Sequence, residues 1–266
     1  MTNDAAPAFD TSKAHHARVY DYLLGGKDNY AADRAAAEET LKVWPEFGFA
    51  ARANRAFLGR VIRYLAGEAG IRQFLDIGTG IPTAGNTHQV AQEIAAESRV
   101  VYVDYDPIVL AHARALLTSS EAGATEYIHA DLRDTDKILA QASQLLDFTQ
   151  PMAVTLVAIL HAIPDADDPH AIVARLVDAM PPGSYLALSH GGRDLLDEEA
   201  RAGFDNVMSR MVQQTFTLRD RMQVARFFED MDLVEPGLVP VEQWRQEAHP
   251  GDTRKSSLWG AVGRKR

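Results

Sequence analysis

The sequence predicts an α/β protein whose single sheet is mostly parallel and is preceded by an all-helical segment. From residue 71 onward, short apolar runs alternate with stretches of helical periodicity. Strands that alternate with helices give a parallel sheet covered on both faces. The first seventy residues show helical periodicity alone. With 266 residues, 46% of them hydrophobic, the chain is long enough for one such domain with an added subdomain.

The N-terminal segment is predicted to contain three helices. Residues 15–24, 31–44 and 49–66 carry apolar side chains at helical spacing, and the second helix is expected to end before Pro45. Four arginines in the third helix recur at near-helical spacing and are interpreted as a solvated face: Arg52, Arg55, Arg60 and Arg63. Residues 1–70 are therefore expected to form a helical cap or lid on residues 71–266, the two making one structural unit.

The sheet domain is predicted to alternate regularly. Strands are expected at 73–77, 100–103, 126–129, 153–159 and 185–189, with helices at 87–97, 108–117, 136–145 and 169–180 between them. The connections are expected to be right-handed crossovers. Helical stretches at 197–213 and 218–231 form a helical insertion of about 193–231. Two extended segments, 233–239 and 257–263, are expected to pair as an antiparallel hairpin at one edge.

Composition excludes several classes of protein. The chain has no cysteine, which rules out disulfides, thiolate nucleophiles and cysteine metal sites. A formal net charge of −10 disfavours nucleic acid as a partner. The longest apolar run, 152–163, is too short to span a membrane, and the N-terminus lacks the features of a signal peptide, so a cytoplasmic protein is expected. Histidines and aspartates between 161 and 170 fit no standard ligand spacing, so no metal is predicted.

A glycine-rich turn follows the first predicted strand. In Asp76-Ile-Gly-Thr-Gly80, the two glycines allow the backbone to turn sharply and to approach a ligand closely. A Gly-x-Gly sequence by itself also fits an ordinary turn between a strand and a helix. The surrounding acids decide between these interpretations.

Three successive strands of the predicted sheet end in an aspartate: Asp76, Asp104 and Asp131. The carboxyl edge of such a sheet is where open α/β folds bind ligands. Asp104 is placed to accept both hydroxyls of a ribose, and Asp131 to reach an adenine edge. The alternative is that these acids only terminate strands and cap the following helices. An adenosine-containing ligand is the interpretation that explains all three.

The turn favours one adenosine cofactor over another. A dinucleotide needs a small third residue where the turn meets the helix, and Thr83 after Pro82 stands there instead. Asp76 would also lie near the phosphates, whereas it suits the positive ammonium and sulfonium groups of S-adenosyl-L-methionine. Methyl transfer from that cofactor, with S-adenosyl-L-homocysteine as product, is therefore expected. A nicotinamide-dependent oxidoreductase and a non-catalytic sensor that only binds the cofactor stay open as alternatives.

The same residues resemble a known family. The chain is similar to class I S-adenosylmethionine-dependent methyltransferases, and more narrowly to a bacterial S-adenosyl methyltransferase family formerly known as a domain of unknown function. The similarity extends from about residue 17 to residue 264, and residues 17–30 and 52–58 carry its narrower part. The resemblance implies a Rossmann-like, seven-stranded sheet of order 3-2-1-4-5-7-6 with the last strand antiparallel. The motifs are Asp76-Ile-Gly-Thr-Gly80, Val103-Asp104-Tyr105-Asp106-Pro107, Ala130-Asp131-Leu132-Arg133-Asp134 and Ala158-Ile-Leu-His161.

The resemblance also implies roles for individual residues. The methionine part of the cofactor is expected beside the turn after the first strand, the ribose on the second strand and the adenine beside the third. Pro82 and Thr83 stiffen that turn relative to many class I enzymes. The implied contacts are Asp76, Gly78, Thr79 and Gly80 to methionine, Asp104 to ribose, Tyr105, Asp131 and Leu132 to adenine, and the backbone from Ala158 onward to the closing pocket.

The glycine pair at residues 25 and 26 is predicted to belong to a lid. It follows a helix, so a plain helix stop is the alternative. The tyrosines and polar residues around it exceed what a stop needs, and Gly25, Lys27 and Asn29 are therefore expected to contact the cofactor.

Two residues are candidates for catalysis, His161 and Tyr20. His161 follows the fourth strand, where it is suited to take a proton from an oxygen or nitrogen acceptor. A histidine bonded to backbone at a strand end is the alternative, and alignment of the acceptor alone is sufficient chemistry for methyl transfer. The expected partner is a small-molecule methyl acceptor, with no nucleic acid and no membrane; the oligomeric state is left open.

Overall fold

The computed structural model describes residues 10–83, 85–116, 119–212, 216–246 and 254–266. In these residues one sheet has the order β3-β2-β1-β4-β5-β8-β6, and the short strand β7 also pairs with β8. The neighbours from β3 to β5 are parallel, and β8 is antiparallel to β5, β6 and β7. The predicted mostly parallel sheet and its strand order are confirmed, with β7 as an addition. The strands are β1 (Gln73–Ile77), β2 (Arg99–Asp104), β3 (Ala124–His129), β4 (Ala153–Val157), β5 (Tyr185–Gly191), β6 (Met231–Leu233), β7 (Val239–Pro240) and β8 (Leu258–Lys265).

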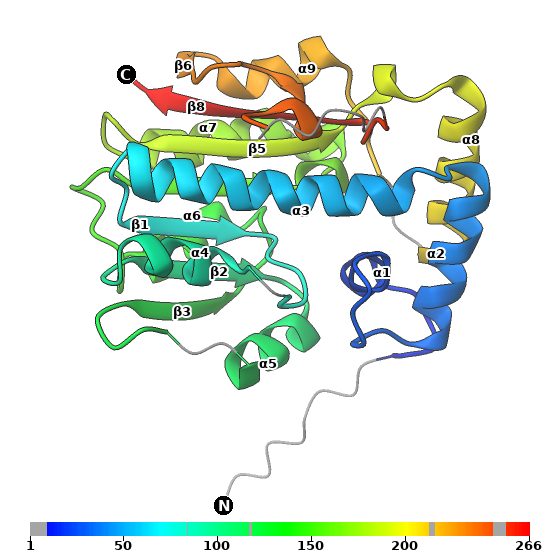
Figure 1. Ribbon diagram of the computed structural model, residues 1–266, viewed down its shortest axis with the longest axis horizontal. Coiled ribbons are helices and arrows are strands. Elements are labelled where there is room, and N and C mark those ends of the chain that lie inside the picture. The colour runs from blue at the N-terminus through cyan, green and yellow to red at the C-terminus, as the bar shows by residue number, and fades with distance from the viewer. Residues whose placement is uncertain (1–9, 84, 117–118, 213–215, 247–253) are drawn as a thin grey trace, which may run out of the picture.

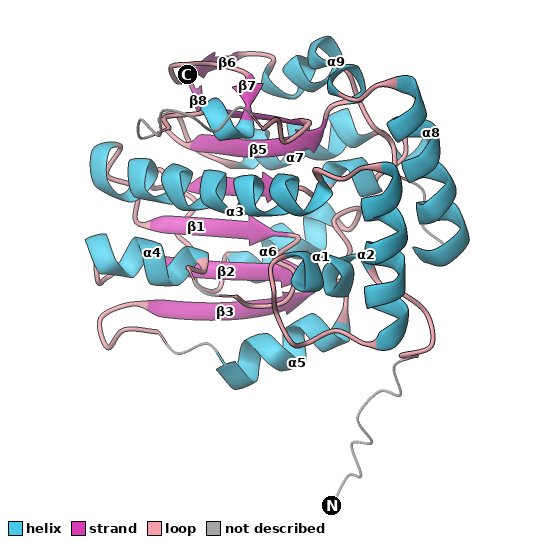
Figure 2. Ribbon diagram, turned by 45° about the vertical axis from the view of Figure 1, so that its right-hand side comes forward, coloured by secondary structure: helices cyan, strands magenta, loops and turns pink. Residues whose placement is uncertain are grey.

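Helices cover both faces and the carboxyl edge of the sheet. Helix α3 lies along one face, and α1 and α2 lie beyond the arrowheads of β1 and β2 (Figures 1 and 2). None of the described helices is long and apolar enough to cross a bilayer. The α-helices are α1 (His16–Leu23), α2 (Ala31–Val43), α3 (Phe47–Arg63), α4 (Thr87–Ile94), α5 (Pro107–Leu116), α6 (Thr135–Ala142), α7 (Pro169–Ala179), α8 (Glu198–Val207) and α9 (Arg221–Ala225). Helices α3 and α8 each continue into a π-helical turn, Tyr64–Glu68 and Met208–Val212.

The two faces of the sheet carry separate cores because side chains alternate along each strand. In β1, Leu75 and Ile77 pack into the core that includes α6 and α7 side chains. Phe74 packs into the other core, which includes α3. By the same alternation Asp76 shares the face of Phe74, so this acid points toward the helical segment at the N-terminus.

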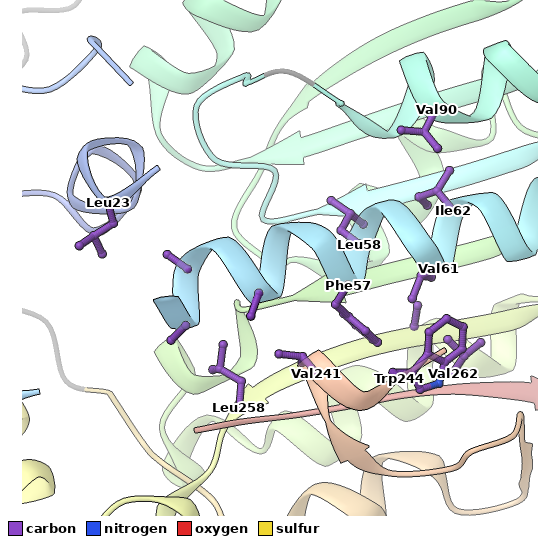
Figure 3. Close-up of a cluster of buried hydrophobic side chains, with 14 of the residues drawn as sticks. Leu23, Phe57, Leu58, Val61, Ile62, Val90, Val241, Trp244, Leu258 and Val262 are labelled. Carbon is purple, nitrogen blue, oxygen red and sulfur yellow. The ribbon is translucent and has the colours of Figure 1, made fainter. Parts of the chain in front are cut away.

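Helix α3 anchors the C-terminal part of the chain to the sheet. Phe57 and Trp244 are buried with their rings edge to face, 5.6 Å between centroids (Figure 3). Arg60 donates hydrogen bonds to the carbonyl oxygens of Val241 and Trp244, at 2.6 and 2.7 Å. The interpretation of the α3 arginines as one solvated face is therefore wrong at Arg60. Its guanidinium satisfies backbone carbonyls that the packing of this segment removes from water.

Three segments depart from their predicted structure. The helical stretch predicted at 218–231 is reduced to α9 and a 3-10 turn at Arg226–Phe228, and Met231 already begins β6. The predicted strand at 233–239 is interrupted, because Pro236 and Gly237, which has a φ of 84°, turn the chain between β6 and β7. Both short strands pair with β8 rather than forming a simple hairpin. The predicted strand at 153–159 ends at Val157, because Ala158 has a φ of 56° and its N–H bonds to Ser189 of β5.

A buried acid organises the N-terminal helices. The Asp33 carboxylate accepts hydrogen bonds from the backbone N–H groups of His15 and Tyr30, both at 2.8 Å. It also pairs with the guanidinium of Arg18 at 3.0 Å, and both side chains are almost fully buried. One carboxylate therefore links the first turns of α1 and α2, which lie over the carboxyl edge of the sheet.

Candidate functional site

Two cavities adjoin at the carboxyl edge of the sheet. The larger has about 1200 Å³ of space, its mouth included, and lies between the sheet and α1, α2, α3 and α8. The smaller has about 580 Å³ and lies over the ends of β2 and β3. Gly78, Ile159 and His16 line both cavities, so one elongated ligand can occupy them together.

The turn after β1 separates the two cavities and requires glycine at position 78. Gly78 has a φ of 77°, which favours glycine. A Cβ atom there would lie 2.6 Å from the side chain of Ile159. Gly80 also has a positive φ, 66°, but a Cβ there would meet no atom within 4 Å. The backbone at Gly78 therefore borders both cavities, and Ile159 occupies the position that a side chain at 78 would need.

Asp104, at the end of β2, lines the smaller cavity. Its two carboxylate oxygens accept hydrogen bonds from the backbone N–H groups of Gly80, at 3.0 Å, and of Asp106, at 2.9 Å. Burial raises the pKa of Asp104 to about 6, although both backbone N–H groups act to lower it. Each oxygen keeps a further lone pair, so the carboxylate can still accept hydrogen bonds from a hydroxyl-bearing ligand.

Asp131, after β3, lines the same cavity but is already paired. Its oxygens accept from Nε and Nη2 of Arg133, at 2.9 and 2.6 Å, and this pairing lowers the pKa of Asp131. Arg133 also contacts Asp167, which follows β4, at 2.9 Å. The guanidinium thus joins two loops beside the smaller cavity. Leu132 is buried in the cavity wall, as an apolar contact for an aromatic base requires.

Asp76 lies in the wall of the larger cavity and is buried. Its carboxylate accepts from the hydroxyls of Thr87, at 2.6 Å, and Thr155, at 2.7 Å. Burial raises its pKa against the effect of these hydroxyls. A cation bound nearby would stabilise the ionised carboxylate. Neither threonine was predicted as part of the site, because threonine on a buried strand or at a helix start has no distinctive pattern.

Aromatic rings form the far wall of the larger cavity, away from the turn after β1. Trp44, Phe47 and Phe204 contact one another with centroids 4.8–5.8 Å apart. Phe216 packs edge to face against Phe204 at 5.8 Å. Further apolar residues complete the lining: Val19, Leu58, Val157, Met208, Val212, Leu218 and Leu258. The sequence analysis did not identify these residues, which come from separate helices and carry no common motif.

Of the two candidate catalytic residues, Tyr20 is fully engaged. Its hydroxyl donates to the carbonyl oxygen of Ala51 at 2.9 Å and accepts from the side-chain amide of Asn54 at 3.0 Å. Burial raises the pKa of Tyr20. The Asn54 oxygen in turn accepts from the hydroxyl of Ser189 at 2.6 Å. Tyr20 therefore shapes the cavity wall and is a poor proton acceptor.

His161 is placed differently. It lies on the turn Leu160–Ala162 after β4 and lines the larger cavity, its ring 5.0 Å from that of Phe216. Its Nδ1 atom is buried and has no hydrogen-bond partner among the described residues. Burial holds the pKa of His161 well below its usual value, helped by His190, His16 and Arg219. The imidazole is thus neutral near pH 7, and its ring lies in the wall of the cavity.

A buried arginine holds the turn that carries His161. Arg219 donates to the carbonyl oxygens of Leu160 and Ile163, both at 3.0 Å, and to the carboxylate of Asp165 at 2.6 Å. It also contacts Nε2 of His190 at 2.9 Å. Sequence reasoning missed Arg219, since a single arginine at the start of the predicted helical stretch 218–231 gives no signal of burial.

The residues predicted as a lid lie in the loop between α1 and α2. Lys27 and Gly25 are exposed, and Asn29 donates to the Asp21 carboxylate at 2.8 Å. Neither cavity is lined by these three residues. Their contact with a cofactor stays a prediction.

Two histidines connect the cap to the end of β2 instead. His15 Nε2 lies 2.9 Å from the hydroxyl of Tyr105, and its Nδ1 lies 3.1 Å from the carboxylate of Asp106. The ring of His16 stacks on that of Tyr105 with centroids 6.2 Å apart. Tyr105, which is 42% exposed, thus links the smaller cavity to α1.

Comparison with known proteins agrees with this architecture. The sequence model of a family described as S-adenosyl methyltransferase matches residues 2–266. A search of curated proteins found no match. A structure of a DUF574 family protein from Streptomyces avermitilis is 44% identical, with a TM-score of 0.92 over 97% of this chain and 99% of that one.

Two further structures extend the comparison. A candidate methyltransferase from Thermobifida fusca is 39% identical, covers both chains completely and has a TM-score of 0.88. An S-adenosylmethionine-dependent methyltransferase from Anabaena variabilis is 14% identical and has a TM-score of 0.52 over 78% of this chain and 84% of that one, which shows a shared fold alone. The chain therefore belongs to the S-adenosyl methyltransferase family and has the fold of class I methyltransferases.

Proposed function

We propose that the protein transfers a methyl group from S-adenosyl-L-methionine to an oxygen or nitrogen atom of a small-molecule acceptor. The observation that carries this proposal is the pair of adjoining cavities, one lined by strand-end carboxylates and the other by apolar side chains. Binding sites for cofactors commonly combine a few placed polar groups with an apolar lining, as these cavities do.

The residues of the smaller cavity suit the adenosine part of the cofactor. Asp104 has free acceptor capacity for the ribose hydroxyls, and Tyr105, Asp131 and Leu132 surround the adenine position. Position 78 fits as well, because Gly78 lines both cavities and leaves its backbone open to a ligand that extends from one into the other. Asp76 in the larger cavity suits a positively charged methionine group, together with the backbone of Thr79, Gly80 and Ala158.

Within this proposal the chain supplies alignment and a proton acceptor. The bound cofactor would supply an electrophilic methyl group on a positively charged sulfur. The apolar walls exclude water from the acceptor, and holding two reactants in line lowers the barrier substantially. His161 lines the larger cavity, is neutral and has no hydrogen-bond partner for its Nδ1 within the described residues, which supports a role as acceptor of the proton. Tyr20 positions the backbone of α3 rather than exchanging protons.

Calorimetry tests the cofactor. We expect S-adenosyl-L-homocysteine to bind and NAD⁺ not to bind, and we expect Asp104→Asn to weaken the affinity for S-adenosyl-L-homocysteine at least tenfold. Binding of NAD⁺ without binding of S-adenosyl-L-homocysteine would favour an oxidoreductase and refute the proposal. Release of S-adenosyl-L-homocysteine from S-adenosyl-L-methionine in the presence of acceptors tests the reaction. Tight binding without turnover for any acceptor would instead indicate a sensor.

A further inference from the structure

We propose that the methyl acceptor is an uncharged aromatic compound with a ring hydroxyl, which lies among Trp44, Phe47, Phe204 and Phe216 and points its hydroxyl at Nδ1 of His161. This inference rests on the proposed function and specifies the chemical class of the acceptor. It draws on the shape of the apolar wall, the positions of the charged groups and the inventory of polar atoms that face the cavity.

The aromatic wall of the larger cavity suits a flat ring. Trp44, Phe204 and Phe216 meet edge to face, with interplanar angles of 83° between the first two rings and 69° between the last two. Such an arrangement presents both ring faces and ring edges to a guest, and aromatic guests gain from both kinds of contact. Because the walls come from Trp44 directly after α2, from α3, from α8 and from residue 216, the bound ring would lie beneath the helical cap.

Charged groups do not face that wall. Within the described part of the chain, the acid and the guanidinium that line the larger cavity are Asp76 and Arg55. Asp76 is held by two threonine hydroxyls, and Arg55 donates to Asn86 at 2.9 Å and to the carbonyl oxygen of Thr83 at 3.4 Å, both beside the turn after β1. A charged acceptor among the aromatic rings would lose its hydration without gaining a partner, which is costly.

Among the described residues of the cavity wall, His161 has a ring nitrogen that can take a hydrogen bond from the acceptor. Tyr20 and Asn54 use their polar atoms on each other, on Ala51 and on Ser189. Nδ1 of His161 is buried without a partner among the described residues. A neutral imidazole that carries its proton on Nε2 accepts a hydrogen bond at Nδ1, so it matches a hydroxyl donor.

The chemistry of methylation favours a hydroxyl over an aromatic amine. A phenol becomes a strong nucleophile only as it loses its proton, whereas an amine attacks through its lone pair and loses the proton afterwards. In the proposed step the acceptor oxygen forms a bond to the methyl carbon while the carbon–sulfur bond breaks and its electron pair stays on sulfur. The hydroxyl proton passes to Nδ1 of His161 and then to solvent.

Three naphthalene probes of similar size test the charge and shape of the acceptor at pH 7.5: 2-naphthol, 2-naphthoic acid and 2-naphthylmethylamine. Their affinities are measured on protein saturated with S-adenosyl-L-homocysteine. We expect 2-naphthol to bind at least tenfold more tightly than either charged probe. A tighter carboxylate or ammonium probe, or no binding of any of the three, overturns the inference. Failure of S-adenosyl-L-homocysteine itself to bind would instead overturn the proposed function, so the two failures are distinguishable.

A pair of matched variants locates the binding site. Phe204→Leu should weaken 2-naphthol binding at least fivefold and leave the affinity for S-adenosyl-L-homocysteine unchanged. Phe148→Leu is the control, since Phe148 packs in the core on the opposite face of the sheet and lines neither cavity. Equal affinities in the two variants would place the acceptor elsewhere and refute the assignment.

The role of His161 is tested by asking whether the loss of kcat in a His161 variant depends on the acidity of the acceptor. For His161→Gln we expect kcat with 2-naphthol to fall by about 100-fold, as the loss of a general base typically does. With 4-nitro-1-naphthol, which is already ionised at pH 7.5 and should therefore bind more weakly, the loss of kcat at saturating acceptor should be less than fivefold. Equal losses for both acceptors would mean that His161 only shapes the cavity, and would refute proton transfer to Nδ1.

Discussion

The two cavities at the carboxyl edge of the sheet are built in different ways. The smaller is made from the ends of β1, β2 and β3, whose polar side chains are held by backbone N–H groups and by Arg133. The larger is made mostly from apolar side chains of α1, α3, α8 and the segments that follow α2 and α8. The ends of paired strands hold a few polar groups in fixed positions. The side chains on packed helices can differ, and a different set of side chains fits a different ligand. We infer that the smaller cavity and the turn after β1 define the cofactor, and that the aromatic end of the larger cavity defines the acceptor.

The largest expected effect is a loss of folding free energy when the buried contacts of the helical cap are broken. Asp33→Ala removes the buried partner of Arg18 and the acceptor for two backbone N–H groups. Breaking a buried ion pair by removing one partner typically costs about 3–5 kcal/mol of folding free energy. Denaturant unfolding should show a loss of this size, or a separate early transition for the cap.

The control for this variant is an exposed pair on the same helix. Glu39→Gln breaks the contact between Glu39 and Lys42, and should change the unfolding free energy by less than about 0.5 kcal/mol. If the two variants lose the same stability, the buried carboxylate does not organise the cap. The proposed difference between the carboxyl edge of the sheet and the helical cap would then lose its support.

The next effect acts on the junction that both cavities share. Gly78→Ala introduces a Cβ 2.6 Å from Ile159 at a φ of 77°, whereas Gly80→Ala introduces only an unfavourable φ of 66°. Backbone strain of this kind costs about 1–3 kcal/mol. We expect Gly78→Ala to weaken S-adenosyl-L-homocysteine binding more than tenfold and Gly80→Ala to weaken it less. Calorimetry on both variants, with circular dichroism to confirm folding, decides the order; a reversed order would show that the close contact at Gly78 is not limiting.

A third effect is a dependence of S-adenosyl-L-homocysteine affinity on pH, which should arise in the smaller cavity alone. The pKa of Asp104 is raised to about 6, mainly by burial, with Asp106 adding to the rise and the N–H groups of Gly80 and Asp106 opposing it. Only the ionised carboxylate accepts hydrogen bonds from both ribose hydroxyls, so affinity for S-adenosyl-L-homocysteine should fall about tenfold between pH 7 and pH 5.

The sign of this effect distinguishes it from unfolding. Because the native pKa of Asp104 lies above that of an unfolded aspartate, its protonation between about pH 6 and pH 4 favours the native state. Asp104→Asn should bind weakly at both pH values and show no such slope. A slope that persists in Asp104→Asn would mean that another group controls binding.

The same contrast explains what could be predicted from the sequence. The strands and the three strand-end acids follow patterns of period and spacing that survive in a single chain, and β1 was predicted to the residue. The strand order was predicted from the family resemblance. The aromatic wall could not be predicted in either way, because Trp44, Phe204 and Phe216 lie on segments up to 172 residues apart (216 − 44). The residues next to each of them in the sequence form no recognisable motif. Arg219 and the threonines beside Asp76 were missed for a related reason: burial of a polar side chain depends on partners that only the fold brings together.

The smallest expected effect lies at the rim of the smaller cavity. Arg133→Met removes the links from Arg133 to Asp131 and Asp167, all of which are at least partly exposed. Exposed pairs contribute little, so the free energy of unfolding should change by less than about 1 kcal/mol. The freed Asp131 can then turn toward an adenine, and we expect affinity for S-adenosyl-L-homocysteine to change by less than fivefold while 2-naphthol affinity stays constant. A change in 2-naphthol affinity as large as that of Phe204→Leu would show that the two cavities do not recognise their ligands separately, since Arg133 lines only the smaller one.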